Sequence, residues 1–247
     1  PRSTWSLTRK HFDVLHANSP LTVGLLAYLT ASTKNLPLIY TYHTSITDYT
    51  RSLKVIGGTG VLRHAARWFS TTSTNLGDQI VVPSSKFHRL LLEQKVTKPI
   101  HVIPNGIDLS NFKTAKKTGS FRNRLGLKSD APLLLSVGRV DPEKRLDFLI
   151  DAFARMADQI PDAHLVFAGD GSARKKLEEH AAATNVNDRI HFLGMVNRVE
   201  LPDLLHDATV FLSASTTETQ GIAMLEATAA GLPVVAVKDD AFAGMFE

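Results

Sequence analysis

The regular alternation of short apolar runs with helical patterns constrains the fold of this chain more than any other feature. The second half, residues 131–247, contains five apolar runs of strand length, and stretches with apolar residues at helical spacing separate most of them. The runs cover residues 133–138, 164–168, 190–193, 208–214 and 233–237. Strands that alternate with helices pair in parallel. This half is therefore expected to be α/β, with a doubly wound parallel sheet.

The first half shows the same alternation. Strands are expected over residues 12–17, 36–43, 79–84 and 100–104, with helices over residues 20–30, 59–74 and 85–94. Residues 109–130 differ, because they are rich in Lys, Ser, Thr, Asn and Gly and show little apolar periodicity. We therefore expect an N-terminal domain over residues 1–108, a linker over residues 109–130 with a short helix near residues 121–125, and a C-terminal domain over residues 131–247.

Composition excludes several classes of protein. Hydrophobic residues make up 43% of the chain and charged residues 21%, as in soluble globular proteins. No apolar run approaches the ~20 residues that span a bilayer. The chain has no Cys, which excludes disulfides, thiolate catalysis and thiolate metal sites.

The net charge of +4 is unevenly distributed. Residues 1–108 hold twelve Lys and Arg against five Asp and Glu, a net charge of +7, so the remainder carries −3. A basic half suggests an anionic partner such as a phospholipid surface, a phosphate or a nucleic acid. Ordinary surface solubility explains the same charge equally well.

A strand, a polar loop and a short helix over residues 208–230 contain the most informative pair of acids. Glu218 lies in the loop, and Glu226 lies in the helix that Gly221 opens and Gly231 closes. Such a loop lies at the carboxyl end of its strand, where open parallel sheets bind ligands. The first helical turn can bind phosphate and the carboxylates can hold hydroxyl groups, so the segment suits a nucleotide sugar. The alternative is a helix whose acids favour its dipole and face solvent.

Two cations follow the first strand of the C-terminal half. Gly138 ends that strand, and Arg139 and Lys144 bracket the turn before the next helix. Cations at this end of a strand can neutralise a departing diphosphate. A simple turn with a solvated Lys, in which Glu143 pairs with either cation, explains these residues equally well.

Two weaker candidates for site residues also follow predicted strands. The tight turn Gly169-Asp170-Gly171 is typical of structural loops. The functional interpretation is that the two glycines let a nucleotide approach the backbone closely. His43 is expected to end a strand of the basic half, where it could face a cleft, and His16 is similarly placed. A lone His is more often structural. The sequence has no Walker A loop, dinucleotide fingerprint, zinc spacing or Gly-x-Ser-x-Gly elbow.

Together these residues resemble the retaining glycosyltransferases of family 4, which have the GT-B fold. The matching motifs, spread over nearly the whole chain, are Glu218-x7-Glu226, Gly138-Arg139 with Glu143-Lys144, Gly169-Asp170-Gly171, Phe192-Leu193-Gly194, Pro104-Asn105-Gly106-Ile107-Asp108 and Ala229-Ala230-Gly231-Leu232-Pro233. The resemblance implies two Rossmann-like domains facing a cleft. It also implies retaining transfer of a hexose from a nucleotide-diphosphate sugar to an acceptor hydroxyl, without a metal or other cofactor.

The resemblance also assigns roles to residues. It implies that Glu226 binds ribose hydroxyls, that Glu218 holds the donor sugar, and that His43 reaches this sugar from the N-terminal domain. Arg139 and Lys144 would hold the diphosphate. The other donor-binding residues that it implies are Gly138, Gly169, Asp170, Thr219, Gln220, Gly221 and Ile222, with Met195 and Val196 near the base.

Residues 42–49 and 217–221 look like the branch of the family that glycosylates diacylglycerol. We expect a UDP- or GDP-linked donor and no nucleic acid partner. The branch implies a lipid acceptor, so we also expect a cytoplasmic enzyme that reaches this acceptor at the anionic inner face of a membrane. The basic first half fits such a surface. The family has a strand and a Gly-rich loop before the first strand found here. We therefore expect two or three βα units of ~30 residues each to be missing, and the chain alone to be inactive or part of a longer one.

Other functions remain open. The same fold could serve a nucleotide-sugar epimerase or a glycogen-synthase-like polymerase, and the spacing of Glu218 and Glu226 with the two cations favours transfer over epimerisation. A non-catalytic module that binds nucleotides or nucleic acid is the third possibility. The chain shows no alternation of aromatic and basic residues like that of an RNA-binding sheet.

Overall fold

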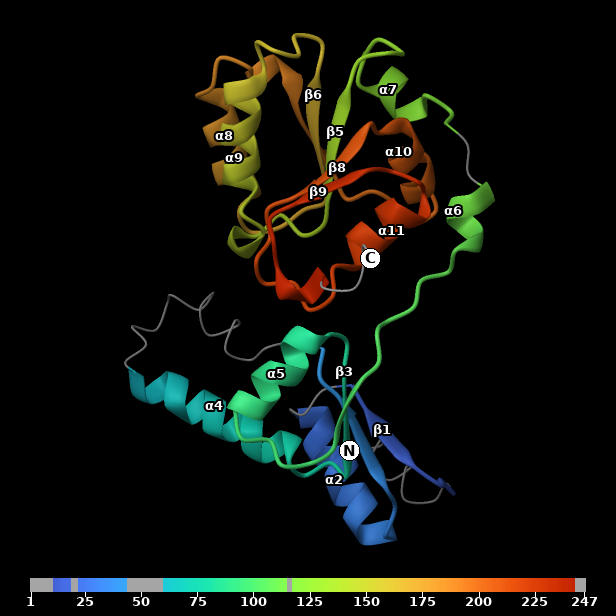
Figure 1. Ribbon diagram of the computed structural model, residues 1–247, viewed down its shortest axis with the longest axis vertical. Coiled ribbons are helices and arrows are strands. Elements are labelled where there is room, and N and C mark those ends of the chain that lie inside the picture. Colours follow the sequence, from blue (N-terminus) through green and yellow to red (C-terminus); the bar gives the residue numbers. More distant parts are fainter. Residues whose placement is uncertain (1–10, 19–21, 44–59, 115–116, 243–247) are drawn as a thin grey trace. The chain divides into compact units, whose positions relative to one another are not determined.

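The computed structural model describes residues 11–18, 22–43, 60–114 and 117–242, which form two compact units. The first contains the described residues up to Asn105 together with residues 240–242, and the second contains those of residues 106–239. Each unit has its own parallel sheet (Figure 1). Each also has its own buried core.

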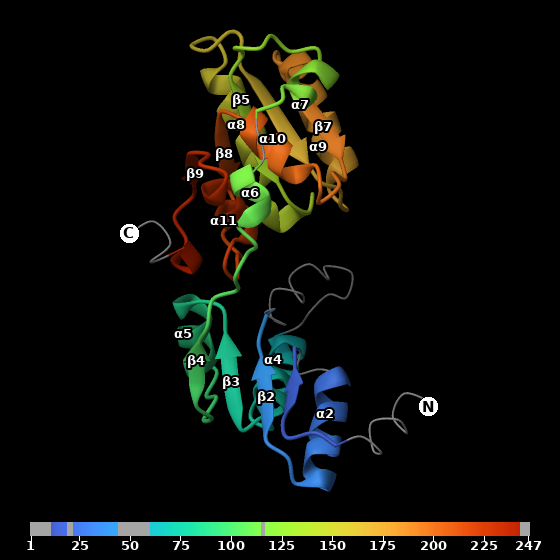
Figure 2. The same cartoon turned by 90° about the vertical axis from the view of Figure 1, so that its right-hand side faces the viewer.

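The first unit is built on a four-stranded parallel sheet in the order β1-β2-β3-β4 (Figure 2). Its elements are β1 (Leu15–Ala17), α2 (Thr22–Lys34), β2 (Leu38–Thr41), α4 (Gly60–Thr74), β3 (Gln79–Val82), α5 (Ser85–Glu93), β4 (Ile100–Val102) and the short helix η3 (Asp240–Phe242). Leu38 and Tyr40 of β2 alternate with the side chains of the other face and pack with Ile80 of β3 and Leu91 of α5. The strands therefore pair as the alternation in the sequence predicts.

The second unit is built on a five-stranded parallel sheet in the order β7-β6-β5-β8-β9. Its elements are α6 (Ser110–Thr114), α7 (Ser120–Arg124), β5 (Leu133–Val137), η1 (Pro142–Lys144), α8 (Leu146–Met156), β6 (His164–Ala168), α9 (Arg174–Ala182), η2 (Asn187–Arg189), β7 (Ile190–Gly194), α10 (Leu201–Asp207), β8 (Val210–Ser213), α11 (Ile222–Ala229) and β9 (Val234–Ala236). From β5 the chain winds outward to β7 and then returns to β8 on the other side of β5. Helices α8 and α9 cover one face, and α10 and α11 cover the other (Figure 1).

The central strand of this sheet explains its apolar sequence. Every residue of β5 from Leu133 to Ser136 is buried, because helices cover both faces of the sheet. On one of these faces Leu149 and Phe153 of α8 pack in the same core as Leu165 of β6. The reversal of winding between β5 and β8 leaves a crevice at the carboxyl ends of these two strands, the position at which such sheets bind ligands.

Residues 109–130 do not behave as the linker that their composition suggests. They lie in the second unit and contain α6 and α7, the latter at the position expected for a short helix. Asp207, which is fully buried, accepts hydrogen bonds from the backbone N–H of Gly119 at 2.8 Å and of Phe121 at 3.0 Å. Buried Arg122 donates to the carbonyl oxygens of Ala131 and Asp207. Polar residues distant in sequence therefore attach this segment to α10.

None of the helices in the described part of the chain is both long and apolar enough to cross a bilayer.

Candidate functional site

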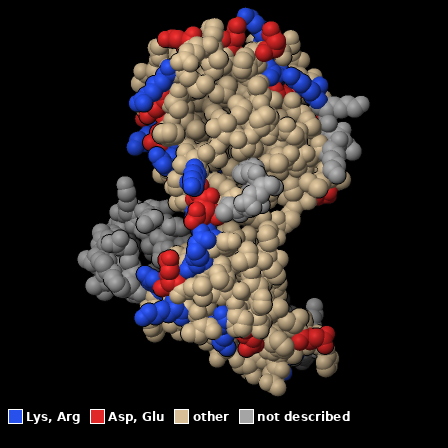
Figure 3. All heavy atoms as spheres, in the orientation of Figure 1, with Lys and Arg blue, Asp and Glu red and all other residues tan. Residues whose placement is uncertain are grey.

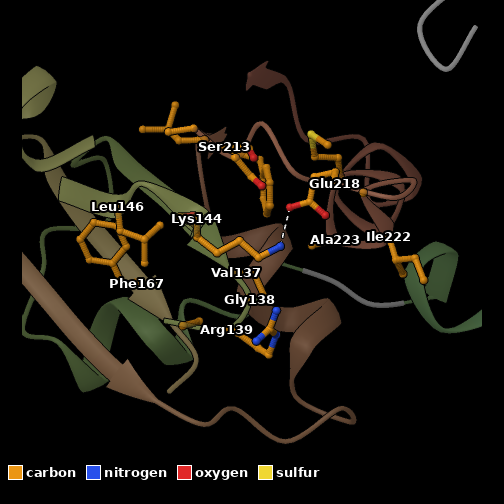
Figure 4. Close-up of a pocket in the computed structure, with 18 of the residues that line it drawn as sticks. Val137, Gly138, Arg139, Lys144, Leu146, Phe167, Ser213, Glu218, Ile222 and Ala223 are labelled. Atoms are coloured by element: carbon orange, nitrogen blue, oxygen red, sulfur yellow. Dashed lines mark hydrogen bonds and ion pairs between the residues drawn. The ribbon is translucent and has the colours of Figure 1, made fainter. Parts of the chain in front are cut away.

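A cavity of about 480 Å³ lies at the carboxyl ends of β5 and β8 (Figure 4). The residues after β5, the end of β8, the loop that follows it and the first turn of α11 form its walls. Leu146 and Phe167 line an apolar side. The predicted site residues that line it are Gly138, Arg139, Lys144, Glu218, Thr219, Gly221 and Ile222. The crevice created by the winding of the sheet is therefore a real pocket, and charged groups reach it from two loops.

Lys144 and Glu218 point toward one another in this cavity (Figure 4). Lys144 Nζ donates to Glu218 Oε1 at 2.5 Å, and the two side chains are only 22% and 17% exposed. Lys144 ends η1, whereas Glu218 lies in the loop before α11, 74 residues further along the chain. The neighbouring positions of β5 and β8 bring a cation and a carboxylate together, and charge-assisted hydrogen bonds of this kind are among the stronger ones.

Arg139 is the second cation at the cavity, and it is held by two acids. Its guanidinium pairs with Asp141 and, at 2.7 Å, with Glu143 Oε1, while two-thirds of its side chain stays exposed. Asp141 Oδ1 also accepts hydrogen bonds from the backbone N–H and hydroxyl of Ser172. Burial alone would raise the pKa of Asp141, but the hydrogen bonds from Ser172 and the charges of Arg139 and Lys144 together lower it.

The first turn of α11 contributes donors to the same cavity. Gly221 caps the helix with φ +79°, a left-handed conformation that glycine adopts without strain. Helices leave their first backbone N–H groups without partners inside the helix, and these groups favour anions. Ser215 lines the cavity with 1% of its surface exposed, and its hydroxyl has no hydrogen-bond partner among the described residues.

Glu226 lies one turn into α11 and outside the residues that line the cavity. It is 6% exposed, and Arg198 approaches its Oε1 to 3.6 Å from the loop after β7. Burial raises the pKa of Glu226, and the charge of Arg198 partly opposes this shift. The same loop holds exposed Met195 and half-buried Val196. The sequence interpretation did not single out Arg198, although it follows Val196 by only two positions.

The Gly169-Asp170-Gly171 turn packs against protein in this structure. A Cβ on Gly169 would lie 1.8 Å from the carbonyl oxygen of Gly138, and one on Gly171 would lie 2.4 Å from that of Val140. Asp170 pairs with Arg174 at the start of α9. Gly169 and Asp170 do not line the cavity, and neither does buried Gln220. Close packing of two loops, the structural alternative for this turn, therefore accounts for both glycines.

His43 belongs to the first unit and follows β2 by two residues instead of ending the strand. It is half-buried, and burial together with the charge of His16 lowers its pKa. His16 in turn is hydrogen-bonded through Nε2 to the Thr41 hydroxyl at 2.6 Å. The two histidines thus lie near the carboxyl end of the first sheet, and contact of His43 with a donor sugar stays a prediction. Within the described residues, no group of three or more His, Asp and Glu is arranged to hold a metal ion.

Comparison with protein families covers nearly the whole chain. Residues 118–247 match the family described as glycosyl transferases group 1, and residues 1–111 match the family described as glycosyltransferase family 4.

Two curated relatives have the same description, alpha-monoglucosyldiacylglycerol synthase. The protein from Acholeplasma laidlawii is 29% identical over 242 residues, which cover 95% of this chain and 61% of the relative. The protein from Streptococcus pneumoniae is 32% identical over 230 residues, which cover 91% of this chain and 51% of the relative. The chain thus spans between about half and three-fifths of the length of these proteins.

Solved structures share the fold. Anabaena HepE in complex with UDP-glucose superimposes with a TM-score of 0.81 at 20% sequence identity, over all of this chain and 65% of that one. A sucrose-phosphate synthase from Thermosynechococcus elongatus superimposes with a TM-score of 0.75 at 22% identity, over 97% of this chain and 59% of that one.

Proposed function

The chain belongs to the glycosyl transferases group 1, and we propose that it takes part in transferring a hexose from a nucleotide-diphosphate sugar to an acceptor hydroxyl. The observation that carries this proposal is the Lys144–Glu218 pair inside the cavity of the second unit. A nucleotide sugar presents phosphates and sugar hydroxyls next to one another. A cation beside a carboxylate, together with the amino end of α11, matches both groups.

The arrangement of the site suggests how the donor lies in it. The diphosphate is held by Lys144, Arg139 and the first turn of α11, and the hexose hydroxyls donate to Glu218. Glu226 accepts from the ribose hydroxyls, because it lies one turn further along the same helix. The base lies near Met195 and Val196, in the loop from which Arg198 approaches Glu226.

The proposed chemistry is transfer with retention. The acceptor oxygen bonds to the anomeric carbon from the face that the diphosphate leaves, the bond from this carbon to the phosphate oxygen breaks, and the acceptor proton passes to the departing diphosphate. Lys144 and Arg139 neutralise the charge that develops on that group. Cations of the protein thus supply the stabilisation for which other transferases use a divalent ion.

A membrane lipid is the proposed acceptor. The curated relatives named above are described as alpha-monoglucosyldiacylglycerol synthases, and residues 1–108 carry a net charge of +7. On α4, Trp68 is 70% exposed and lies between Arg67 and half-exposed Phe69, a combination suited to the interface of an anionic bilayer. Figure 3 shows Lys and Arg on the surface of the first unit near α4 and α5. We therefore propose a peripheral enzyme at the inner face of the membrane.

Calorimetry with a panel of UDP- and GDP-sugars, in buffer containing EDTA, tests the donor site. UDP-glucose is the first probe, because it occupies the structurally similar HepE. Lys144→Ala and Glu226→Ala are each expected to weaken binding at least tenfold, or ~1.4 kcal/mol. Lys128→Ala is the matched control, because Lys128 pairs with exposed Asp162 and does not line the cavity. Unchanged affinity in both site variants would reject the assignment, and donor conversion to another free nucleotide sugar would favour an epimerase.

A further inference from the structure

The Lys144–Glu218 pair poses a conflict for the ligand proposed above. The cation that a diphosphate requires is already bound to a carboxylate, with the two charged atoms 2.5 Å apart. The exposed fractions of 22% and 17% mean that water screens this pair less than it screens a surface ion pair. A diphosphate that enters the cavity must therefore either displace Glu218 from Lys144 or place its own negative charge beside that of Glu218.

We propose that Glu218 competes with the diphosphate for Lys144, and that the pocket thereby distinguishes the intact nucleotide sugar from the nucleoside diphosphate left after transfer. This inference rests on the proposed function. The intact donor brings sugar hydroxyls, which donate hydrogen bonds to Glu218 and replace those from Lys144. A nucleoside diphosphate brings no such donors, so Glu218 loses its hydrogen bond from Lys144 and faces like charges on the phosphates.

The competition also suggests how the product is released. Once the hexose has moved to the acceptor, the hydroxyls that held Glu218 leave with it. The carboxylate then returns to Lys144 and takes the place of a phosphate oxygen on that cation. Arg139 does not have this dual role, because its acids are Asp141 and Glu143 and its side chain is two-thirds exposed. The selectivity therefore depends on the carboxylate that serves both the cation and the sugar.

Glu218→Gln tests the competition, because the amide keeps the shape of the side chain and removes its charge. Affinity for UDP is expected to rise about three- to tenfold, the scale of a partly buried ion pair. Affinity for UDP-glucose is expected to rise less or to fall, because a neutral amide accepts hydrogen bonds from the sugar hydroxyls less strongly than a carboxylate does. The ratio of the two dissociation constants, measured by calorimetry, is the diagnostic quantity. GDP and GDP-mannose replace these probes if only guanine nucleotides bind.

Glu143→Gln provides the matched control, since it removes a carboxylate near the same cations without touching Lys144. If Glu143→Gln acts only by changing the overall charge of the cavity, it raises the affinities for UDP and UDP-glucose equally. The ratio of their two dissociation constants then stays as in the wild-type protein. In a Lys144→Ala background, Glu218→Gln is expected to raise UDP affinity less than it does in the wild-type protein, because competition for the cation has been removed and only the repulsion between Glu218 and the phosphates is relieved. Glu218→Asp, which withdraws the carboxylate by one methylene, repeats the test if the amide variant does not fold.

The outcomes separate this inference from the function on which it rests. If the wild-type protein binds UDP and UDP-glucose but Glu218→Gln leaves UDP affinity unchanged or weaker, the competition is refuted and the donor site stands. An equal gain for both ligands also refutes it. If the wild-type protein binds neither nucleotide family, the proposed function itself fails.

Discussion

At the scale of single residues, we predict that Ser215 contributes to ligand binding at the expense of stability. Ser215 lines the cavity of the second unit, and its buried hydroxyl has no hydrogen-bond partner among the described residues. Such a group costs about 1–3 kcal/mol while it stays unsatisfied. Native proteins retain few of these groups, and those they retain often have a functional reason.

At this scale we predict that Ser215→Ala raises the free energy of unfolding by up to ~1 kcal/mol, because it removes an unsatisfied group. The same change is expected to weaken UDP binding, since the phosphate oxygens lose a donor. Urea unfolding and calorimetry measure the two effects. Ser84→Ala, which removes a similarly buried hydroxyl from the first unit, is expected to match the gain in stability without the loss of affinity. A loss of stability in Ser215→Ala, or an unchanged affinity, contradicts this role.

At the scale of elements, glycine residues allow the two loops that follow β5 and β6 to pack closely against one another. Gly169 adopts φ +141° directly against the carbonyl oxygen of Gly138, where a side chain has no room. The contact includes a hydrogen bond from Val140 N–H to the Asp170 carbonyl oxygen at 2.9 Å. Because Gly138 and Arg139 border the cavity, this packing sets the position of one wall of the site.

We therefore predict that Gly169→Ala lowers the free energy of unfolding by roughly 3 kcal/mol or more, through backbone strain and overlap with Gly138. Gly119→Ala is the matched control: Gly119 also has a positive φ, +71°, but nothing lies within 4 Å of the added Cβ. It is expected to cost only about 1–2 kcal/mol. Denaturant unfolding of both variants measures the difference, and equal losses would show that overlap between the loops is unimportant.

At the scale of the whole molecule, the boundary between the two units lies near Asn105, and residues 109–130 fold with the second unit. Buried Asp207 joins that segment to α10 through two backbone hydrogen bonds. Asp207→Asn is expected to destabilise the second unit by about 1–3 kcal/mol, because the two N–H groups donate to different carboxylate oxygens and an amide keeps only one of these acceptors.

Hydrogen exchange provides a regional readout of this prediction. Backbone amides of α7 are expected to lose protection in Asp207→Asn, whereas those of β2 and β3 in the first unit keep theirs. Asp162→Asn, which removes only the exposed pair with Lys128, is expected to change neither region. If α7 is unprotected in the wild-type protein, residues 109–130 behave as a linker after all.

Local patterns in the chain were sufficient to predict the fold class. The alternation of apolar runs with helical spacing predicted two parallel sheets, and the family and the GT-B fold are confirmed by the matches to both family descriptions and by the likeness to HepE. The sequence also predicted approximately where Arg139, Lys144 and Glu218 lie in the fold. Each of them comes after an apolar strand, and parallel strands expose their carboxyl ends at one edge.

Local sequence patterns could not predict the side-chain contacts that form the candidate site. That Lys144 meets Glu218, that Arg198 meets Glu226 and that Asp207 caps α7 depends on which strands are neighbours and how loops distant in sequence pack. The same local patterns are compatible with several strand orders. The placement of β8 beside β5 sets Leu134 against Val210 and Leu135 against Phe211, and only this tertiary choice brings the loops of the two strands to one cavity.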